Sequence, residues 1–362
     1  MSIQNNYVAI MAGGIGSRFW PESRQNLPKQ FLDLLGTGST LLQDCFYRFR
    51  DICPKENIFI VTNKAYFDIV KEQLPEVTEG NIICEPFRKN TAPAAAYISY
   101  KLKGLNPDAN IIFAPSDHLI LNQRNFEIQA FKGLDYAAKH DAIVTFGIHP
   151  TRPDTGYGYI QYAKHSLMDG IAKSIVFTEK PNLELARVFL SSGDFVWNSG
   201  IFIWNVKTFI KKLEELQPEM AEVFEQGQNS YNTPKEYATM ERLYTQTTNN
   251  LSIDYAIMEK ANNVFVLPSN FGWSDLGTWE SAYEHSQKDY LGNATFSNEV
   301  FVVDSDNCLV KTDKGKLVVL QGMQNYIVVD TKDVLLICER SKQQEIKDYV
   351  AEIKSNFGDK YL

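Results

Sequence analysis

An apolar run that ends in a cluster of glycines is the feature that most restricts how this chain can fold. Residues 7–12 are almost wholly apolar, and Gly13, Gly14 and Gly16 follow at once. A short run without polar alternation is typical of a parallel strand buried on both faces. Glycines without a Cβ let the backbone turn sharply and present N–H groups to an anion. The start of the chain therefore predicts a buried strand followed by an anion-binding loop.

Two cationic residues follow these glycines. Arg18 comes two residues after Gly16, and Lys29 comes eleven residues after Arg18. A polyphosphate needs backbone donors for its oxygens and fixed positive charge for its net charge. Glycines alone are equally typical of an ordinary turn between a strand and a helix. The added cations favour a polyphosphate site.

The glycine spacing excludes two common nucleotide-binding motifs. A dinucleotide fingerprint needs Gly-x-Gly-x-x-Gly, but the third position counted from Gly14 and Gly16 is Phe19. A P-loop needs Gly-Lys followed by Ser or Thr, and this loop lacks that sequence. An NAD-dependent oxidoreductase is therefore disfavoured.

Length, charge and cysteine usage limit the class of protein further. A chain of 362 residues predicts one large domain plus a smaller one. Its net charge of −8 argues against a nucleic-acid partner, which normally meets a basic face. No apolar stretch approaches the roughly 18 residues of a membrane span, and the first residues do not resemble a signal peptide. The five scattered cysteines favour reduced thiols and a cytoplasmic location.

Strand and helix patterns alternate after the glycine loop. Residues 57–62 and 81–86 predict buried strands, while 40–51 and 65–74 have the apolar spacing of helices. This alternation predicts an α/β, Rossmann-like domain with a mostly parallel sheet and helices on both faces. Ligands of such sheets bind beyond the carboxyl ends of the strands. The glycine loop is expected at that edge.

Two acidic residues at predicted strand ends are candidates for ligand binding. Glu85 ends the predicted strand over 81–86, and a carboxylate there could accept hydrogen bonds from two adjacent donors of a ligand. Asp117 follows the apolar run 110–114, and Mg²⁺ prefers one or two carboxylates together with phosphate oxygens and waters. An Asp in this position can also be a simple helix cap.

The segments that carry these residues resemble the sugar-nucleotide pyrophosphorylases. The signature is Gly-Gly-x-Gly-x-Arg from Gly13 and Pro-Lys-Gln-Phe from Pro28. The version with Phe-Trp-Pro from Phe19 is most similar to the mannose-1-phosphate guanylyltransferase (GDP-mannose pyrophosphorylase) family. The resemblance extends from about residue 7 to residue 279 and, more loosely, to the end.

The resemblance implies transfer of GMP from GTP to α-D-mannose 1-phosphate, which yields GDP-mannose and pyrophosphate by in-line attack assisted by Mg²⁺. It implies catalytic roles for Arg18 and Lys29. Segment 271–279 resembles the second metal motif of the family, so Asp275 is expected to join Asp117 as a metal ligand. Carboxylates so far apart in sequence can meet only through the fold.

The resemblance also implies two groups of binding residues. Residues expected at the nucleotide are Ala12, Gly13, Gly14, Gly16, Glu85, Asn90, Thr91 and Ser116. In such a pocket Glu85 could accept from both N1–H and N2–H₂ of guanine, whereas a uracil or thymine edge offers only one such donor. Residues expected at the sugar phosphate are Gly156, Glu179, Lys180 and Asn198.

Several of these residues have a structural alternative that the sequence leaves open. Asn90 or Thr91 can cap a helix that begins near Pro93. Gly156 can belong to a hairpin turn. Asn198 lies inside a very apolar run, where a buried amide needs a partner. That partner can be a sugar hydroxyl or the backbone at a bulge.

Glu179 and Lys180 pose a geometric question, because neighbouring residues on a strand point to opposite faces. A bend before Pro181 could bring both side chains to one site. Segment 252–259 also resembles the family, where it lies beside the sugar site. Asp254 in this segment can simply favour the helix dipole.

The chain changes character after about residue 293. Short β-rich runs occur at 298–303, 308–311, 316–321, 325–329 and 334–338, with a helix near 343–354. They predict a C-terminal β-rich domain over 291–362, after a nucleotidyltransferase domain over 1–290. In relatives such a domain has parallel β-helical character and often mediates dimerisation, so a homodimer is expected.

Two other functions remain open. One is transfer with another base or sugar, such as UTP or dTTP with glucose 1-phosphate. The other is a non-catalytic regulator that binds a sugar nucleotide on the same fold. A regulator predicts the loss of a cation or a metal carboxylate, yet all four such residues are present, namely Arg18, Lys29, Asp117 and Asp275.

Overall fold

A computed structural model describes residues 3–248, 250–297, 299–313 and 315–362. The chain divides into two compact units. The first unit comprises Met1–Gly13, Phe46–Ser116 and Ile120–Trp273, and the second comprises Gly14–Cys45, Asp117–Leu119 and Ser274–Leu362. This division differs from the predicted boundary after residue 290, which stays a prediction.

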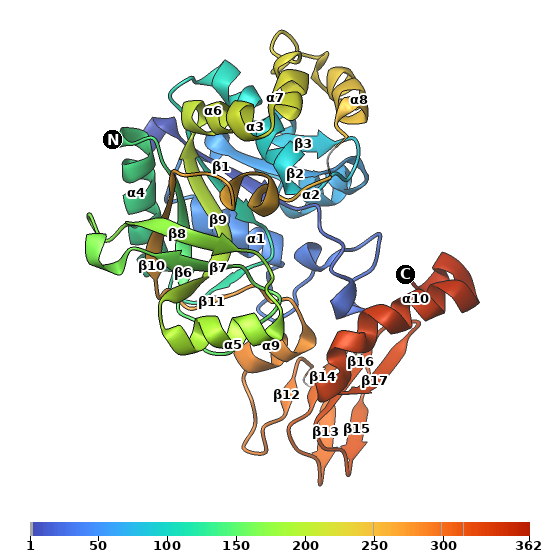
Figure 1. Cartoon of the computed structure of the whole chain (residues 1–362). Helices are drawn as coiled ribbons and strands as arrows, with labels where there is room; N and C mark the ends of the chain where they lie inside the picture. The colour runs from blue at the N-terminus through green and yellow to red at the C-terminus, as the bar shows by residue number, and fades with distance from the viewer. Residues whose placement is uncertain (1–2, 249, 298, 314) are drawn as a thin grey trace. The chain divides into compact units, whose positions relative to one another are not determined.

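A nine-stranded sheet forms the centre of the first unit within the described residues, with the order β3-β2-β1-β4-β9-β6-β10-β8-β7 (Figure 1). Strands β1 to β4, β6 and β10 run in one direction, and β9 runs against its neighbours β4 and β6. The mostly parallel sheet predicted from the sequence is therefore confirmed. Its strands are β1 (Asn6–Met11), β2 (Ile58–Asn63), β3 (Ile82–Glu85), β4 (Asn110–Pro115), β6 (Ile143–Ile148), β7 (Tyr159–Tyr162), β8 (Ala172–Thr178), β9 (Phe195–Asn205) and β10 (Val264–Ser269).

Strand β1 occupies the position that its apolar sequence predicts. It pairs in parallel with β2 on one side and with β4 on the other. Every residue from Asn6 to Ile10 is buried. A strand between two neighbours has no edge to solvent, and both of its faces are covered by other elements.

Helices cover both faces of this sheet, and β9 shows how. Phe202 and Trp204 belong to the core cluster that contains α6 (Val206–Leu216). Ile203 between them points to the other face, where a Cβ added to Gly133 of α4 (Gln123–Lys139) would lie 2.5 Å from the Ile203 side chain. The other helices that lie wholly or partly in this unit are α1 (Leu41–Phe49), α2 (Phe67–Gln73), α3 (Thr91–Leu105), α5 (Leu183–Ser192), α7 (Pro218–Glu225) and α8 (Glu236–Gln246).

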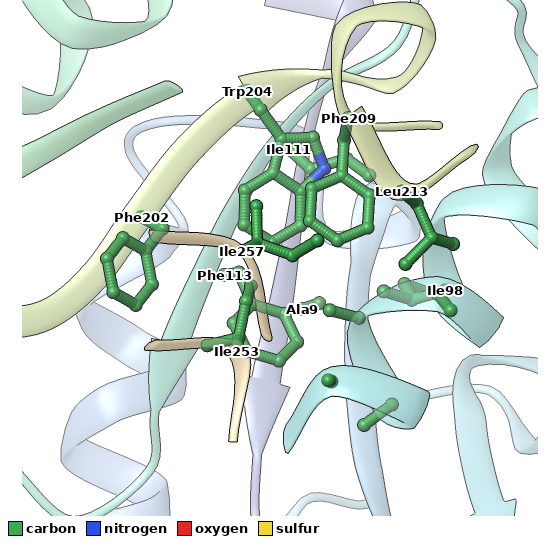
Figure 2. Packing of buried hydrophobic residues seen from close by; sticks show 14 of the residues in the cluster. Ala9, Ile98, Ile111, Phe113, Phe202, Trp204, Phe209, Leu213, Ile253 and Ile257 are labelled. Carbon is green, nitrogen blue, oxygen red and sulfur yellow. The ribbon is translucent and has the colours of Figure 1, made fainter. Parts of the chain in front are cut away.

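Figure 2 shows the aromatic centre of this core, against which the segment around Ile253 and Ile257 packs. Trp204 and Phe209 stack with ring centroids 4.3 Å apart. Ile253 and Ile257 are buried in the same cluster. They hold a short π-helical segment, Asp254–Met258, against the core. The sequence predicts an ordinary helix start here, and the π-helical turn was not foreseen.

The second unit contains the C-terminal strands. Strands β12, β14 and β16 stack in parallel, β17 pairs antiparallel with β16, and β13 pairs in parallel with β15. Successive strands thus alternate between two small parallel stacks, which fits the expected β-helical character. The strands are β12 (Ala294–Thr295), β13 (Val300–Val303), β14 (Leu309–Thr312), β15 (Val318–Gln321), β16 (Tyr326–Asp330) and β17 (Leu335–Glu339), and the helices are α9 (Trp279–His285) and α10 (Ile346–Phe357).

The β-rich C-terminal region predicted from the sequence is confirmed with small shifts in its boundaries. The strand predicted over 298–303 is observed over Val300–Val303, and residue 298 lies outside the described residues. Two further short strands, β5 (Leu119–Ile120) and β11 (Trp273–Ser274), contain positions where the chain passes from one unit to the other. No helix in the described ranges has the length and apolar composition of a membrane span.

Candidate active site

The carboxyl ends of three parallel strands in the first unit carry predicted nucleotide-binding residues. Ala12 follows β1, Glu85 ends β3, and Ser116 follows β4. The Ser116 amide donates to the Met11 carbonyl at 3.1 Å, and the Thr62 hydroxyl donates to the Ala12 carbonyl at 2.7 Å. Parallel strands end at one edge of a sheet, which is where α/β sheets bind ligands.

Glu85 is a buried carboxyl at this edge. Its Oε1 accepts a hydrogen bond from the Tyr244 hydroxyl at 2.9 Å. Its Oε2 faces Gly13, since a Cβ added to Gly13 would lie 4.0 Å from it. Burial raises the pKa of Glu85 to about 7, while the Tyr244 hydrogen bond acts to lower it. Glu85 is thus a titratable acceptor beside Gly13, and the sequence did not indicate Tyr244.

Asn90 and Thr91 tie the start of α3 to a distant segment. Asn90 has a φ of +65°, and its side chain accepts from the Thr91 amide, as the capping alternative predicts. The Thr91 hydroxyl accepts from the Ile253 amide at 2.9 Å. Both residues therefore have structural roles. Their contact with a nucleotide stays a prediction.

Two of the residues predicted to bind the sugar phosphate, Glu179 and Asn198, lie against Gly158. A Cβ added to Gly158 would lie 2.3 Å from Glu179 Oε2 and 3.2 Å from the Asn198 Cβ. The Asn198 amide donates to the Gly158 carbonyl at 2.8 Å. They meet because Tyr159 pairs with both Thr178 and Trp197. A side chain at position 158 would displace the Glu179 carboxylate.

Glu179 and Lys180 lie beyond the end of β8, where the strand rule no longer applies. Lys180 has a φ of +48°, and its Nζ donates to Glu179 Oε1. The Glu179 side chain is only 6% exposed, whereas that of Lys180 is 56% exposed. The chain thus bends before Pro181 and brings both side chains together, as one of the two alternatives requires.

The second oxygen of Glu179 is an unusual feature of this cluster. Glu179 Oε2 is buried and has no hydrogen-bond partner among the described residues. Leaving a buried acceptor unpaired costs about 1–3 kcal/mol. A ligand hydroxyl donated to this oxygen would remove that cost. The observation favours a polar ligand beside Glu179.

Both polar atoms of the Asn198 side chain form hydrogen bonds with other protein groups. Its Nδ2 donates to Asp254 Oδ1 at 2.9 Å. Its Oδ1 accepts from the Thr145 hydroxyl at 3.2 Å and from the Gly200 amide at 3.1 Å. The register between β6 and β9 also shifts here, so the bulge alternative describes part of its environment. Its contact with a sugar stays a prediction.

Carboxyls outnumber cations in this cluster. Burial, followed by the charge of Asp254, raises the pKa of Glu179 to about 7, although Lys180 acts to lower it. Burial also raises the pKa of Asp254. Glu259 Oε1 accepts from the Glu179 amide at 2.9 Å. The sequence singled out Asp254 only as a residue that can suit a helix dipole, and it did not indicate Glu259.

Gly156 lies in a separate turn. Its amide donates to Asp154 Oδ1 at 2.8 Å, and Asp154 pairs with Arg152 at 2.9 Å. The turn alternative therefore describes Gly156, and its role at the sugar stays a prediction. Gly158, which the sequence analysis did not select, is the glycine that packs against Glu179.

Lys29 is the centre of the cluster in the second unit. Its Nζ lies 3.1 Å from Asp117 Oδ2. It also donates to the carbonyls of Asp275 and Leu276 at 3.1 and 2.9 Å. The Lys29 side chain is 9% exposed. The fold thus brings the Asp117 carboxylate and the backbone carbonyl of Asp275 to the same ammonium, although the two residues lie far apart in the sequence.

The two Asp carboxyls are held by short-range contacts. Burial acts to raise the pKa of Asp117, but the charges of Lys29 and His118 outweigh it, so the pKa lies below its usual value. Asp275 Oδ1 accepts from the Gly277 amide at 3.0 Å. Asp117 therefore stays ionised at neutral pH.

The glycine loop packs on the Lys29 segment. Gly16 has a φ of +65°, and a Cβ there would lie 2.8 Å from the Cβ of Lys29. The Gln30 side chain donates to the Gly14 carbonyl at 3.0 Å. Only glycine fits at position 16, for both its backbone angle and its contact.

Arg18 differs from Lys29 in its surroundings. The side chain is exposed, and it forms no hydrogen bond or ion pair with any described residue. The next residue, Phe19, is buried edge-on against Trp279 with ring centroids 5.0 Å apart. An exposed guanidinium on an anchored backbone is available to an anion.

Asp117 and Asp275 are the two acidic residues of this cluster, and their binding of Mg²⁺ stays a prediction. In the described part of the chain, no group of three or more His, Cys, Asp or Glu side chains could form a complete metal site. Mg²⁺ is usually bound by one or two carboxylates plus substrate phosphates and waters. Two carboxyls, one of them held ionised, suit such a shared site.

The chain is similar to known proteins over most of its length. Residues 7–291 match the nucleotidyl transferase family, and residues 298–353 match the MannoseP isomerase/GMP-like beta-helix domain. A mannose-1-phosphate guanylyltransferase of Salmonella montevideo is 38% identical over 355 residues, which cover 95% of this chain and 73% of that protein. The alginate biosynthesis protein AlgA of Pseudomonas aeruginosa is 37% identical over 350 residues, covering 95% and 71%.

A solved structure gives the same similarity in three dimensions. It is described as a mannose-1-phosphate geranyltransferase from Thermus thermophilus. The TM-score is 0.87 at 26% sequence identity, and the match covers 97% of this chain and 100% of that chain.

Proposed function

This chain belongs to the nucleotidyl transferase family, and we propose that within it the chain acts as a mannose-1-phosphate guanylyltransferase. The reaction converts GTP and α-D-mannose 1-phosphate to GDP-mannose and pyrophosphate. The observation that carries the proposal is the meeting of Lys29, Asp117 and Asp275 in the unit that contains Gly16. A buried cation with two acidic residues is suited to reacting phosphates.

The chemistry needs no covalent intermediate with the protein. A phosphate monoester is already a nucleophile, and its oxygen attacks the α-phosphorus of GTP in line. Catalysis then consists of positioning and charge stabilisation. We assign the β- and γ-phosphates to the glycine loop and Arg18, and the α-phosphate to Lys29. Lys180 is assigned to the phosphate of the incoming sugar.

Asp117 and Asp275 are the residues that would hold Mg²⁺. The ion would offset the negative charge of the two phosphorylated substrates when they come together. Lys29 keeps Asp117 ionised, and this is the form that a metal needs.

Recognition of the two substrates is assigned to carboxyls of the first unit. Glu85 would accept from N1–H and N2–H₂ of guanine. Glu179 would accept from a mannose hydroxyl through its unpartnered oxygen. Asn198 is kept in place beside it by Asp254.

A cytoplasmic location and a homodimer complete the proposal. The five cysteines, all within the described ranges, form no disulfide, which suits a reducing compartment. Phe301 and Val319 lie opposite each other on β13 and β15 and are 61% and 58% exposed. Such apolar pairs are suited to burial against a second copy. Light scattering of the purified protein would test this.

The experiment that tests the function is pyrophosphate release in the presence of Mg²⁺. GTP, UTP, dTTP, ATP and CTP are each combined with mannose 1-phosphate and with glucose 1-phosphate. Release only with GTP and mannose 1-phosphate is expected, and removal of Mg²⁺ with a chelator should abolish it. Release with another nucleotide and sugar phosphate would show that the enzyme uses those substrates and not GTP and mannose 1-phosphate. No release from folded protein that still binds a nucleotide would favour a regulator.

A further inference from the structure

Tyr244 is a buried residue that the proposed reaction does not yet use. Its side chain is fully buried, and its hydroxyl donates to Glu85 Oε1 across 159 positions of sequence. Its ring packs edge-on against Phe224 of α7 at 5.6 Å and against Tyr97 of α3 at 6.3 Å. Three helices thus fix the hydroxyl in place. Among the described residues, it is the only hydrogen-bond donor to the Glu85 carboxyl.

The protonation state of Glu85 decides which base edge it can read. An ionised carboxylate accepts on both oxygens and donates nothing. Guanine presents two adjacent donors, N1–H and N2–H₂, which match this form. A protonated carboxyl presents one donor and one acceptor, which match the N1 and N6–H₂ edge of adenine instead.

Burial and Tyr244 act on Glu85 in opposite directions. Burial raises the pKa of Glu85 to about 7, and the hydrogen bond from Tyr244 lowers it. Burial, followed by the charge of Glu85, also raises the pKa of Tyr244 well above its usual value, so this hydroxyl stays a donor. The other titratable groups that face Tyr244 are the hydroxyls of Tyr97 and Tyr231, and Tyr97 is itself bonded to Glu236.

We propose that Tyr244 is a specificity-determining positioning residue, whose buried hydroxyl favours the ionised, acceptor-only form of Glu85 that guanine requires. This inference rests on the proposed function and extends it to a residue outside the sequence motifs. Loss of the hydroxyl leaves Glu85 buried without its donor. A larger fraction of Glu85 would then be protonated at neutral pH, and the match of that fraction to guanine would be lost.

The test compares Tyr244→Phe with Tyr231→Phe. Tyr231 is a matched control, because its buried hydroxyl donates to the Phe224 carbonyl at 2.7 Å and not to Glu85. The measured quantity is kcat/KM for GTP and ATP from about pH 6 to about pH 9. For Tyr244→Phe we expect a roughly tenfold loss with GTP at neutral pH, which recovers as the pH rises. The preference for GTP over ATP should fall, while the KM for mannose 1-phosphate stays unchanged.

A second variant keeps the inference testable if Tyr244→Phe does not fold. Glu85→Gln cannot titrate, and its amide oxygen can still accept from Tyr244. We expect it to lose the preference for GTP over ATP at every pH. An unchanged preference in Glu85→Gln would overturn the inference, as would a wild-type pH profile in folded Tyr244→Phe. Failure of the wild-type protein to use GTP would instead contradict the proposed function.

Discussion

Carboxyls that are largely shielded from water have opposite acid–base behaviour in the two units. In the first unit, burial raises the pKa values of Glu85 and Glu179 to about 7. In the second unit, the pKa of Asp117, whose side chain is 23% exposed, lies below its usual value. The difference is the nearest cation. Lys29 is 9% exposed and sits against Asp117, whereas Lys180 beside Glu179 is 56% exposed.

This contrast shows that burial alone does not set the charge of a carboxyl. A cation that is itself removed from water acts with little solvent screening and reverses the effect of burial. The second unit therefore holds fixed charges, which suit phosphates and a metal ion. The first unit holds two carboxyls with a pKa of about 7, which suit hydrogen bonds to a base and to sugar hydroxyls.

Removal of the buried cation should have the largest effect. Lys29→Ala leaves Asp117 without its partner, and Arg18→Ala removes an exposed phosphate-binding group. We expect each to lower the rate of pyrophosphate release on the order of 10²-fold or more, the scale for losing a preorganised charged donor. Lys316→Ala is the control, because Lys316 pairs with Asp330 in the same unit and is assigned to neither substrate. Near-normal turnover in both Lys29→Ala and Arg18→Ala would contradict the proposed roles of these residues in phosphate binding.

Replacing the buried Glu85 by a neutral residue should stabilise the protein, and this gain over the wild type should be larger at higher pH. The folded-state pKa of Glu85 is raised, so the wild-type protein loses stability between the unfolded-state value and about pH 7. Glu85→Gln avoids this loss. We expect its free energy of unfolding to exceed that of the wild type by up to about 3 kcal/mol above neutral pH, and by much less in mild acid.

Denaturant titration of Glu85→Gln and the wild type, in mild acid and above neutral pH, measures this difference in the free energy of unfolding. In Glu85→Gln the new amide oxygen can still accept from Tyr244, so the substitution removes the charge and keeps the hydrogen bond. An equal difference between variant and wild type at both pH values would show that the charge of Glu85 is not responsible.

The smallest expected effect concerns the support of Glu179. Glu259→Ala removes the acceptor of the Glu179 amide, a hydrogen bond of about 1 kcal/mol. We expect the KM for mannose 1-phosphate to rise roughly fivefold, with the KM for GTP unchanged. Glu259→Gln keeps an acceptor and should restore the wild-type value. Hydrogen exchange of the Glu179 amide should accelerate only in Glu259→Ala, and equal behaviour of both variants would contradict this role.

Much of the fold was predictable from local patterns. The apolar runs 7–12 and 57–62 became β1 and β2, and the helical spacing of 40–51 became α1. Periodicity reports which side of an element is buried, and that information is contained in neighbouring residues. The π-helical segment Asp254–Met258 was missed because it depends on Ile253 and Ile257 packing into a core built by distant strands.

The candidate site, like the fold, has features that the sequence predicts and features that it does not. By itself the sequence determined the chemical groups available, namely the glycine loop, the cations Arg18 and Lys29, and the carboxyls Asp117 and Asp275. It also determined the family, through motifs whose order along the chain is recognisable. These features are local, since each depends on residues a few positions apart.

Only the tertiary structure decided which groups meet and in which protonation state. Lys29 reaches the Asp275 carbonyl across 246 positions, and Tyr244 reaches Glu85 across 159. No local pattern specifies such pairs, because loops and helices of any length can separate them. Burial and the nearest charge then set each pKa, and both are properties of the folded chain. An acidic side chain thus became a fixed charge in one unit and a proton-sensitive acceptor in the other.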